Sequence, residues 1–234
     1  MTVLQYCAAV LFCICFGGLL SGILQQFHVR GFSEADDFGA VLVGTLTFQG
    51  AACALIFVFF RRYQISWRAG FGFNGPDLKR ALLRAVVVFL VALPAAWLLQ
   101  FASVFALTKA GHPPDEQMAV QLIESAKSWW TRSYLAFFDV VLAPVAEEFI
   151  FRGLLYPFIK QLGWPRLALF GLSLLFAVIH FDKAIFLSLF VLALALTWLY
   201  EKTDNLLAPI LAHMLFNATN LVMLVLTHFH VLPE

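Results

Sequence analysis

Residues 85–107 read AVVVFLVALPAAWLLQFASVFAL and contain no charged side chain. A helix needs about 20 mostly apolar residues to cross the hydrocarbon core of a bilayer, which is about 30 Å thick. The whole chain of 234 residues has the same character, because 62% of its residues are hydrophobic and only 12% are charged. Its mean hydropathy of +0.87 lies far above that of a water-soluble globule. The sequence therefore predicts an integral membrane protein.

Further apolar runs on both sides of this stretch predict an all-α fold, a polytopic transmembrane helix bundle of about seven spans. The spans are expected at roughly 3–26, 38–60, 83–107, 133–157, 166–181, 185–201 and 206–227. The fifth and sixth are short, and only Phe181-Asp182-Lys183-Ala184 separates them. We expect these two spans to form a tight hairpin.

The charged loops predict the orientation of the bundle. Positive residues concentrate between the second and third spans: Arg61, Arg62, Arg68, Lys79, Arg80 and Arg84 stand against one acid, Asp77. The loop after the first span has the opposite balance, with Arg30 against Glu34, Asp36 and Asp37. Because cytoplasmic loops are enriched in Lys and Arg, we expect a multi-pass protein of the cell (inner) membrane with a cytoplasmic N-terminus.

The overall charge argues against nucleic acid as a partner. The net charge is +1, and the sequence has no basic patch with interleaved aromatic residues. The expected partners are membrane lipid and a hydrophobic or lipidated peptide or protein. The segment from Asp115 to Trp130 is amphipathic and predicts an interfacial helix that leads into the fourth span. That helix serves either as an ordinary connector or as a guide for substrate.

Ionisable and amide side chains inside the predicted spans concentrate in three of them. An ionisable group in the hydrocarbon region costs at least a few kcal/mol, so each one needs a reason. Span four holds Glu147, Glu148 and Arg152, span five ends in His180, and span seven holds His213 and Asn217. Pro144 and Pro209 precede two of these groups. We expect each proline to kink its helix beside the polar group and to open a hydrated cavity there.

Helical spacing separates the roles of the two adjacent glutamates. At about 100° per residue, Glu148 and Arg152 lie on one helix face, which predicts an ion pair, while Glu147 points about 100° away. Glu147 is therefore the candidate general base, although both glutamates binding the arginine is the alternative. The base, the two histidines and the Asn217 amide together are what peptide hydrolysis by an activated water requires.

Three short motifs carry a family resemblance. Glu147-Glu148-Phe-Ile-Phe-Arg152, Phe176-Ala-Val-Ile-His180 and His213-Met-Leu-Phe-Asn217 resemble, in the same order, the EExxxR, FxxxH and HxxxN motifs of the CAAX-protease and bacteriocin-processing (CPBP) family. The resemblance covers residues 133–227. It divides the chain into amino-terminal transmembrane helices with the interfacial helix (1–130) and a CPBP-like catalytic helical core (131–234).

The resemblance implies an intramembrane endopeptidase that cuts a membrane-associated peptide bond inside a bundle with a water-filled cavity. Glu147 and His180 would activate water, His213 and Asn217 would hold the oxyanion, and Glu148 and Arg152 would support them. No cofactor is expected. The predicted spans place His180 near the outer end of span five, whereas Glu147 and His213 fall nearer mid-membrane. This difference in depth argues against a single shared site.

Other functions stay open at this point. The HExxH spacing of a zinc helix is absent, yet Glu147, His180 and His213 supply three possible zinc ligands for an intramembrane metalloprotease. A non-enzymatic bacteriocin-immunity or scaffold protein of the same family is a second alternative. A proton-coupled carrier is a third, although the polar groups fall in one half of the chain with no matching second half.

Overall fold

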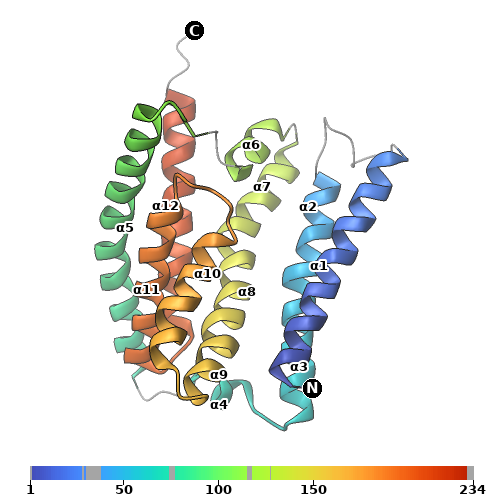
Figure 1. Ribbon diagram of the computed structural model, residues 1–234, viewed down its shortest axis with the longest axis vertical. Helices are drawn as coiled ribbons and strands as arrows, with labels where there is room; N and C mark the ends of the chain where they lie inside the picture. Colours follow the sequence, from blue (N-terminus) through green and yellow to red (C-terminus); the bar gives the residue numbers. More distant parts are fainter. Residues whose placement is uncertain are drawn as a thin grey trace. The chain divides into compact units, whose positions relative to one another are not determined.

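The computed structural model of the chain describes residues 2–27, 29, 38–73, 77–114, 118–126 and 128–230 (Figure 1). Within those residues it is helical and contains no strand. Five helices are long and apolar enough to cross a membrane: Val3–Gln26, Gly39–Arg62, Leu78–Lys109, Phe186–Thr203 and Leu207–Thr227. The first is α1, the third is α5, the fourth is α11, and the fifth belongs to α12 (Leu207–His230). The second combines α2 (Phe38–Thr45), η1 (Leu46–Gly50) and α3 (Ala51–Arg62).

Two further apolar segments complete the predicted set of about seven. Residues 129–161 are helical without a break, through α7 (Trp129–Phe137), η2 (Phe138–Leu142), α8 (Ala143–Ile150), η3 (Phe151–Leu155) and α9 (Tyr156–Gln161). The other is the shorter apolar helix Leu167–Val178, which joins η4 (Leu167–Gly171) to α10 (Leu172–Val178). The predicted fold class, an integral multi-pass helix bundle, is confirmed.

Prolines explain two of the π-helical segments, η2 and η3. Pro144 stands two residues after η2 and Pro157 stands two residues after η3. Proline has no backbone N–H, so the carbonyl four residues earlier loses its α-helical donor. Those carbonyls belong to Val140 and Gly153, which lie inside the two segments. A wider π turn is one way in which a helix accommodates such a loss.

Pro209 does not act as predicted. It occupies the third position of α12, in the first turn, where the backbone N–H groups have no partner within the helix in any case. The Pro209 ring is therefore compatible with the first turn of the helix and does not kink it beside His213. Similarly, α6 (Met118–Ser125) is short, and Trp129 and Trp130 belong to α7. The predicted interfacial helix is thus not continuous with the fourth span.

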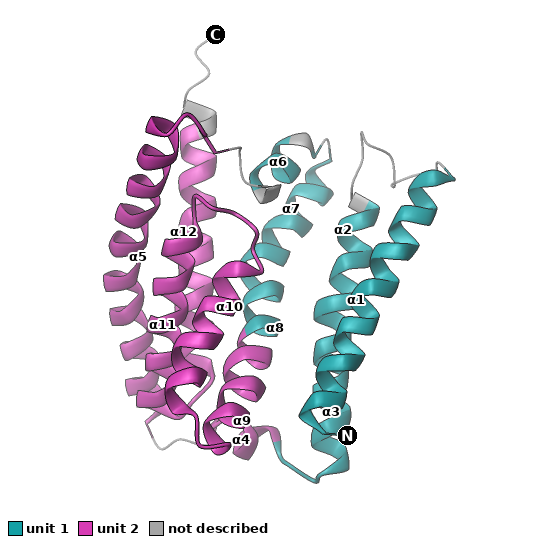
Figure 2. Cartoon of the chain, viewed as in Figure 1, with its two compact units in different colours: residues 1–66, 118–147 teal, residues 67–117, 148–234 magenta. Residues whose placement is uncertain are grey.

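The described chain divides into two compact units (Figure 2). Unit 1 comprises 1–66 and 118–147, and unit 2 comprises 67–117 and 148–234. The border falls inside α8, between Glu147 and Glu148. These units follow packing, whereas the proposed division at residue 130 follows the motifs and stays a prediction. The orientation argument rests partly on residues 30–37, which lie outside the described residues.

Unit 1 is held together by close packing and by hydroxyl groups. The Tyr6 hydroxyl donates to the carbonyl oxygen of Ala52 (3.1 Å) and the Tyr134 hydroxyl donates to Thr45 Oγ1 (3.0 Å). Gly17 of α1 faces Thr47 of η1 so closely that a Cβ atom there would lie 2.2 Å from Thr47 Oγ1. The two helices approach through a residue without a side chain, as is common between transmembrane helices.

In unit 2, α5 packs against both α11 and α12, and α10 packs against α11. Ser188 Oγ of α11 donates to the Ala96 carbonyl (2.6 Å), and Trp97 Nε1 donates to Asn220 Oδ1 of α12 (2.8 Å). At one end of the unit, Arg84 of α5 donates to the carbonyl oxygen of Lys202 in α11 (2.8 Å). These bonds fix α5, α11 and α12 as the frame that positions the polar residues described next.

Candidate active site

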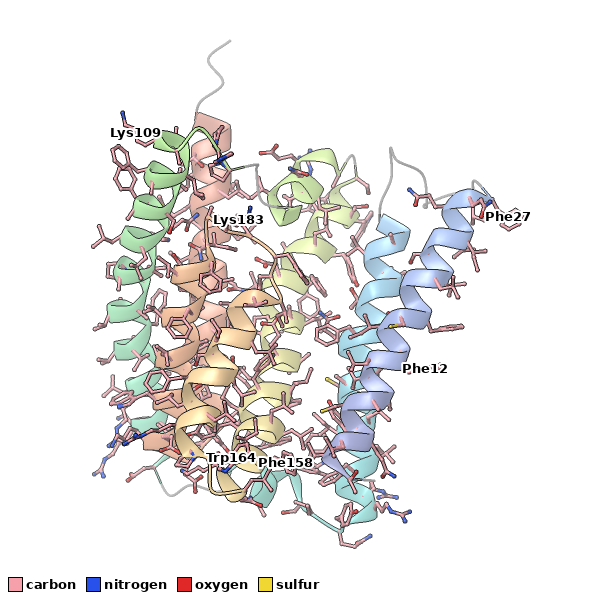
Figure 3. All side chains as sticks on the ribbon, in the orientation of Figure 1. Phe12, Phe27, Lys109, Phe158, Trp164 and Lys183 are labelled. Carbon is pink, nitrogen blue, oxygen red and sulfur yellow. The ribbon has the colours of Figure 1, made fainter. Side chains whose placement is uncertain are left out.

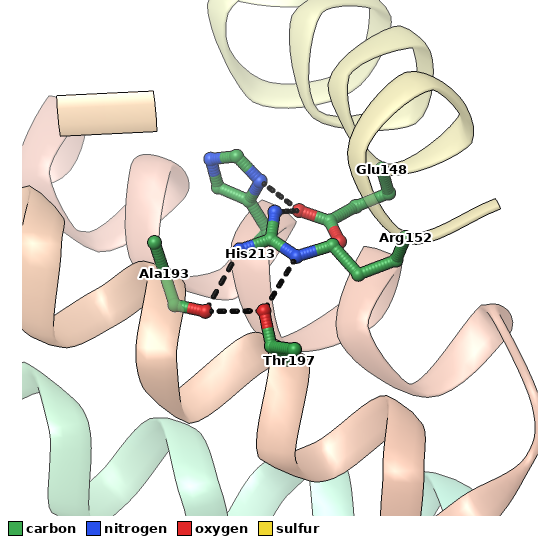
Figure 4. Close-up of polar contacts among 5 residues, drawn as sticks. All are labelled: Glu148, Arg152, Ala193, Thr197 and His213. Atoms are coloured by element: carbon green, nitrogen blue, oxygen red, sulfur yellow. Dashed lines mark hydrogen bonds and ion pairs between the residues drawn. The ribbon is translucent and has the colours of Figure 1, made fainter. Parts of the chain in front are cut away.

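A buried ion pair lies inside unit 2 (Figure 4). Glu148 of α8 is 0% exposed and Arg152 of η3 is 2% exposed. Arg152 donates from its guanidinium Nη1 to Glu148 Oε1 at 2.7 Å. The ion pair predicted from the four-residue spacing is therefore confirmed. Removing either partner would leave an uncompensated charge in the interior.

The remaining donors of Arg152 reach α11. Its Nη2 donates to the carbonyl oxygen of Ala193 (2.9 Å) and its Nε donates to Thr197 Oγ1 (3.3 Å). Thr197 in turn donates to the same carbonyl (2.8 Å). The guanidinium thus ties the glutamate helix to α11. The motifs gave no sign of this contact, although a threonine in the middle of a mostly apolar helix was a signal that could have pointed to it.

His213 of α12 binds the same carboxylate oxygen. Its Nδ1 lies 3.0 Å from Glu148 Oε1, and its side chain is buried. A carboxylate only accepts hydrogen bonds, so Nδ1 carries the proton and Nε2 is the nitrogen left for other partners. Glu148 Oε2 is also buried and accepts no hydrogen bond from the residues that the structure describes. Glu148 therefore joins α8, η3 and α12 through one oxygen atom.

The ring of Phe176, in α10, contacts both histidines. Its centroid is 4.9 Å from that of His180 and 5.8 Å from that of His213. The Arg152 guanidinium carbon lies 5.2 Å from the same ring, within cation–π range. Both histidines therefore contact the same ring in unit 2, although the predicted spans placed them at different depths.

His180 lies in the turn after α10 and is exposed. Its Nδ1 is 2.7 Å from the carbonyl oxygen of Phe176. Since a carbonyl oxygen accepts, Nδ1 is again the protonated nitrogen, and in the neutral ring Nε2 keeps a lone pair. Such an imidazole can accept a proton or a hydrogen bond from water. A metal-binding histidine is oriented in the same way, so both histidines suit either chemistry.

Glu147 and Asn217 are placed by helical register. Asn217 is one turn after His213 on α12 and is half-buried. Glu147 is half-buried and is the last residue of unit 1, and on α8 it points about 100° away from Glu148. Among the described residues, no three side chains of His, Cys, Asp or Glu are grouped as a metal site requires. The structure thus assembles Glu148, Arg152, His180 and His213 around Phe176.

Residues 128–219 match one protein family, described as "Type II CAAX prenyl endopeptidase Rce1-like". The matched segment runs from the start of α7 into α12 and contains all six candidate site residues. It therefore agrees with the resemblance carried by the three motifs. No curated protein and no solved structure matches the chain.

Proposed function

We propose that this protein is an endopeptidase that cuts membrane-associated peptides with water activated by Glu147, because residues 128–219 match the Rce1-like family of type II CAAX prenyl endopeptidases. The substrate is a hydrophobic or lipidated peptide or protein. The observation that carries the proposal is the shared oxygen of Glu148, which binds both Arg152 and His213 inside the bundle. A buried, charged network of this kind is costly unless the site needs it.

The proposed reaction assigns one step to each group. His180 accepts a hydrogen bond from water at Nε2, and Glu147 removes the other proton of that water. The resulting hydroxide bonds to the carbonyl carbon of the substrate, whose oxygen gains negative charge. Asn217 donates its amide N–H to this oxygen. When the C–N bond breaks, the proton held by Glu147 passes to the leaving amine.

The role proposed for His213 follows from its bond to Glu148. Because Nδ1–H is donated to the carboxylate, His213 donates a second hydrogen bond from Nε2 only as the imidazolium. The negative charge of Glu148 stabilises that cation, and the pair then presents a positive N–H to the developing oxyanion. Glu148 and Arg152 act here as positioning residues, since neither touches the reacting atoms in this scheme.

The test uses purified protein in mild detergent, treated with a strong chelator and offered fluorogenic peptides with and without a lipid-modified cysteine. We expect the wild type to cleave and the Glu147→Gln and His180→Ala variants to be at least about 100-fold slower, because each lacks a proton-transfer or water-orienting group. Thermal unfolding shows whether each variant is folded.

Two outcomes replace this proposal. If chelation alone stops cleavage and zinc restores it, the zinc alternative with Glu147, His180 and His213 takes its place. If no peptide is cut, and a phenotype in the native membrane survives Glu147→Gln, the protein acts as a non-enzymatic member of its family.

A further inference from the structure

The start of α5 and the end of α11 carry exposed cations at one end of unit 2. Arg84 of α5 donates to the backbone carbonyl oxygen of Lys202 in α11 (2.8 Å), so these two residues lie at the same level of the bundle. Both side chains are exposed. Arg80 is also exposed and stands one helical turn before Arg84, on the same face of α5. Two helices therefore contribute three cations to this junction.

The acids near the junction do not neutralise these cations. Two of the acids are already engaged in ion pairs, Asp77 with Arg80 and Glu201 with Lys160. Arg84 and the ammonium group of Lys202 form no ion pair with any residue that the structure describes, and Arg84 bonds to a neutral carbonyl. Asp204 is exposed two residues after Lys202, and its single carboxylate cannot neutralise both cations. The junction therefore has positive charge that is available to an external anion.

The junction lies where the apolar part of α5 begins. Residues 85–107 contain no charged side chain, whereas residues 78–84, at the start of the same helix, contain Lys79, Arg80 and Arg84. At 1.5 Å per residue the uncharged run is about 35 Å long, close to the hydrocarbon thickness of about 30 Å. Arg84 therefore lies at the boundary of the hydrocarbon region, and the residues before it lie at the level of the phospholipid headgroups.

Apolar side chains continue from these cations into the membrane. Val87 and Val91 follow Arg84 by three and seven residues, so all three lie on one side of α5. The two valines are 53% and 67% exposed. On α11, Trp198 is 51% exposed four residues before Lys202, and tryptophan is enriched at membrane interfaces. Each helix thus presents a cation and, one turn deeper, an exposed apolar or aromatic side chain. This order matches the charged headgroup and the acyl chains of a phospholipid.

We propose that Arg84 and Lys202 bind the phosphate group of an anionic phospholipid at the junction of α5 and α11, with Arg80 as a further donor. Arg84 donates to the Lys202 carbonyl from Nη1, so Nη2 and Nε are left for the phosphate. The uncompensated charge favours a lipid with a net negative charge over a zwitterionic one. The charged loops predict that this end faces the cytoplasm, and the cytoplasmic leaflet is the one that contains anionic lipids. The bound lipid holds α5 against α11, whether or not the protein is a peptidase.

The experiment measures the affinity of the first bound lipid by native mass spectrometry of the protein in an uncharged detergent. Phosphatidylglycerol and phosphatidylcholine with identical acyl chains are titrated separately. We expect phosphatidylglycerol to bind about 30-fold more tightly, because each of two cations contributes about fivefold to binding of an anionic lipid. Lys202→Gln should lower this preference about fivefold, and the double variant Arg84→Gln, Lys202→Gln should remove nearly all of it. Arg84→Lys should keep most of the preference.

Lys202→Gln tests the charge alone, because the bond from Arg84 uses the backbone of residue 202. Lys109→Gln is the matched control and should keep the full preference. Lys109 is exposed at the other end of α5, and Figure 3 places it at the opposite end of unit 2 from Trp164. Thermal unfolding shows whether each variant is folded.

Three results would overturn the inference. The first is equal binding of the two lipids by the wild type. The second is a preference that Lys202→Gln leaves unchanged, or that Lys109→Gln lowers as much as Lys202→Gln does. The third concerns glycerol phosphate, which has the phosphate of phosphatidylglycerol without its acyl chains. If glycerol phosphate displaces the lipid at an equal concentration, the junction binds a soluble anion and not a phospholipid.

Discussion

The charge of Arg152 is held by three acceptors on two elements, Glu148 Oε1, Thr197 Oγ1 and the carbonyl of Ala193. Lysine cannot reproduce that planar fork, because it is a point charge on a flexible stem. At the residue scale, variants of this network are expected to change the stability of the fold more directly than the chemical step. The network contains no group proposed to touch the reacting atoms except His213.

We expect Arg152→Met to lower the free energy of unfolding by about 3 kcal/mol, because it leaves the buried carboxylate of Glu148 without its cation. Glu148→Gln added to it should cost less than the sum of the two single changes, with a coupling of about 0.5–3 kcal/mol. The measurement is unfolding by SDS titration in mixed micelles. Lys160→Met is the control, since the ion pair of Lys160 with Glu201 is partly exposed and should be worth less than about 1 kcal/mol. If the effects of Arg152→Met and Glu148→Gln on the free energy of unfolding are strictly additive, the two side chains do not interact as described.

The motifs predicted part of this site and missed part of it. The spacing of Glu148 and Arg152 fixed their pairing, because residues four apart on a helix always share a face. The contact of Glu148 with His213 joins residues 65 positions apart, and periodicity within one helix contains no information on such contacts. The roles of the six site residues in catalysis stay predictions until the variants are assayed.

At the scale of the elements, α1 and η1 pack through Gly17. We expect Gly17→Ala to lower the free energy of unfolding by about 1–3 kcal/mol, since its Cβ atom would overlap Thr47 and force the helices apart. Gly18→Ala is the matched control, because nothing lies within 4 Å of a Cβ atom at that position. The same SDS titration compares them. If the two variants unfold alike, α1 does not pack on η1 as described.

The hydrogen bond between Trp97 of α5 and Asn220 of α12 gives a second test at this scale. A double-mutant cycle with Trp97→Phe and Asn220→Leu should show a coupling of about 0.6 kcal/mol, as interhelical hydrogen bonds in membranes do on average. Trp97→Phe combined with Thr227→Val should be additive, because Thr227 bonds only to carbonyls of its own helix. If the first cycle shows no coupling, the hydrogen bond between Trp97 and Asn220 does not help to hold α5 against α12.

Element limits were predictable where apolar runs are long and end at polar or charged residues. Val3–Gln26 was predicted at 3–26, and Phe186–Thr203 at 185–201. The interfacial segment was harder, because amphipathic spacing does not reveal where a helix breaks, and α6 stops before the tryptophan pair. Pro209 was assigned to a kink although the span predicted at 206–227 already placed it in the first turn of α12, where a helix tolerates proline.

At the scale of the whole molecule, the remaining prediction is the orientation in the membrane. The end of unit 2 that carries Trp164 also holds Arg84, Lys160, Arg166 and Lys202, and Lys109 lies at the opposite end (Figure 3). By the positive-inside rule we propose that the first end faces the cytoplasm. After replacement of the four native cysteines, a membrane-impermeant maleimide applied to intact cells should label Lys109→Cys and spare Arg166→Cys. Arg166→Cys should become labelled once the cells are permeabilised. Labelling of Arg166→Cys and protection of Lys109→Cys in intact cells would show the opposite orientation.

The two proline-associated π segments on either side of α8 have a consequence for how this helix tolerates insertions and deletions. Each wide turn contains one residue more than an α-helical path of the same length needs, so it stores a surplus residue in the middle of a membrane helix. Deleting one residue from 138–142 would leave an uninterrupted helix of nearly unchanged length. Because the deletion removes only the surplus residue, the residues before it keep nearly the same orientation about the helix axis relative to the two glutamates. A gap of one residue should therefore be tolerated better in this stretch than in a regular α-helical stretch, where it would rotate the flanking residues by about 100°.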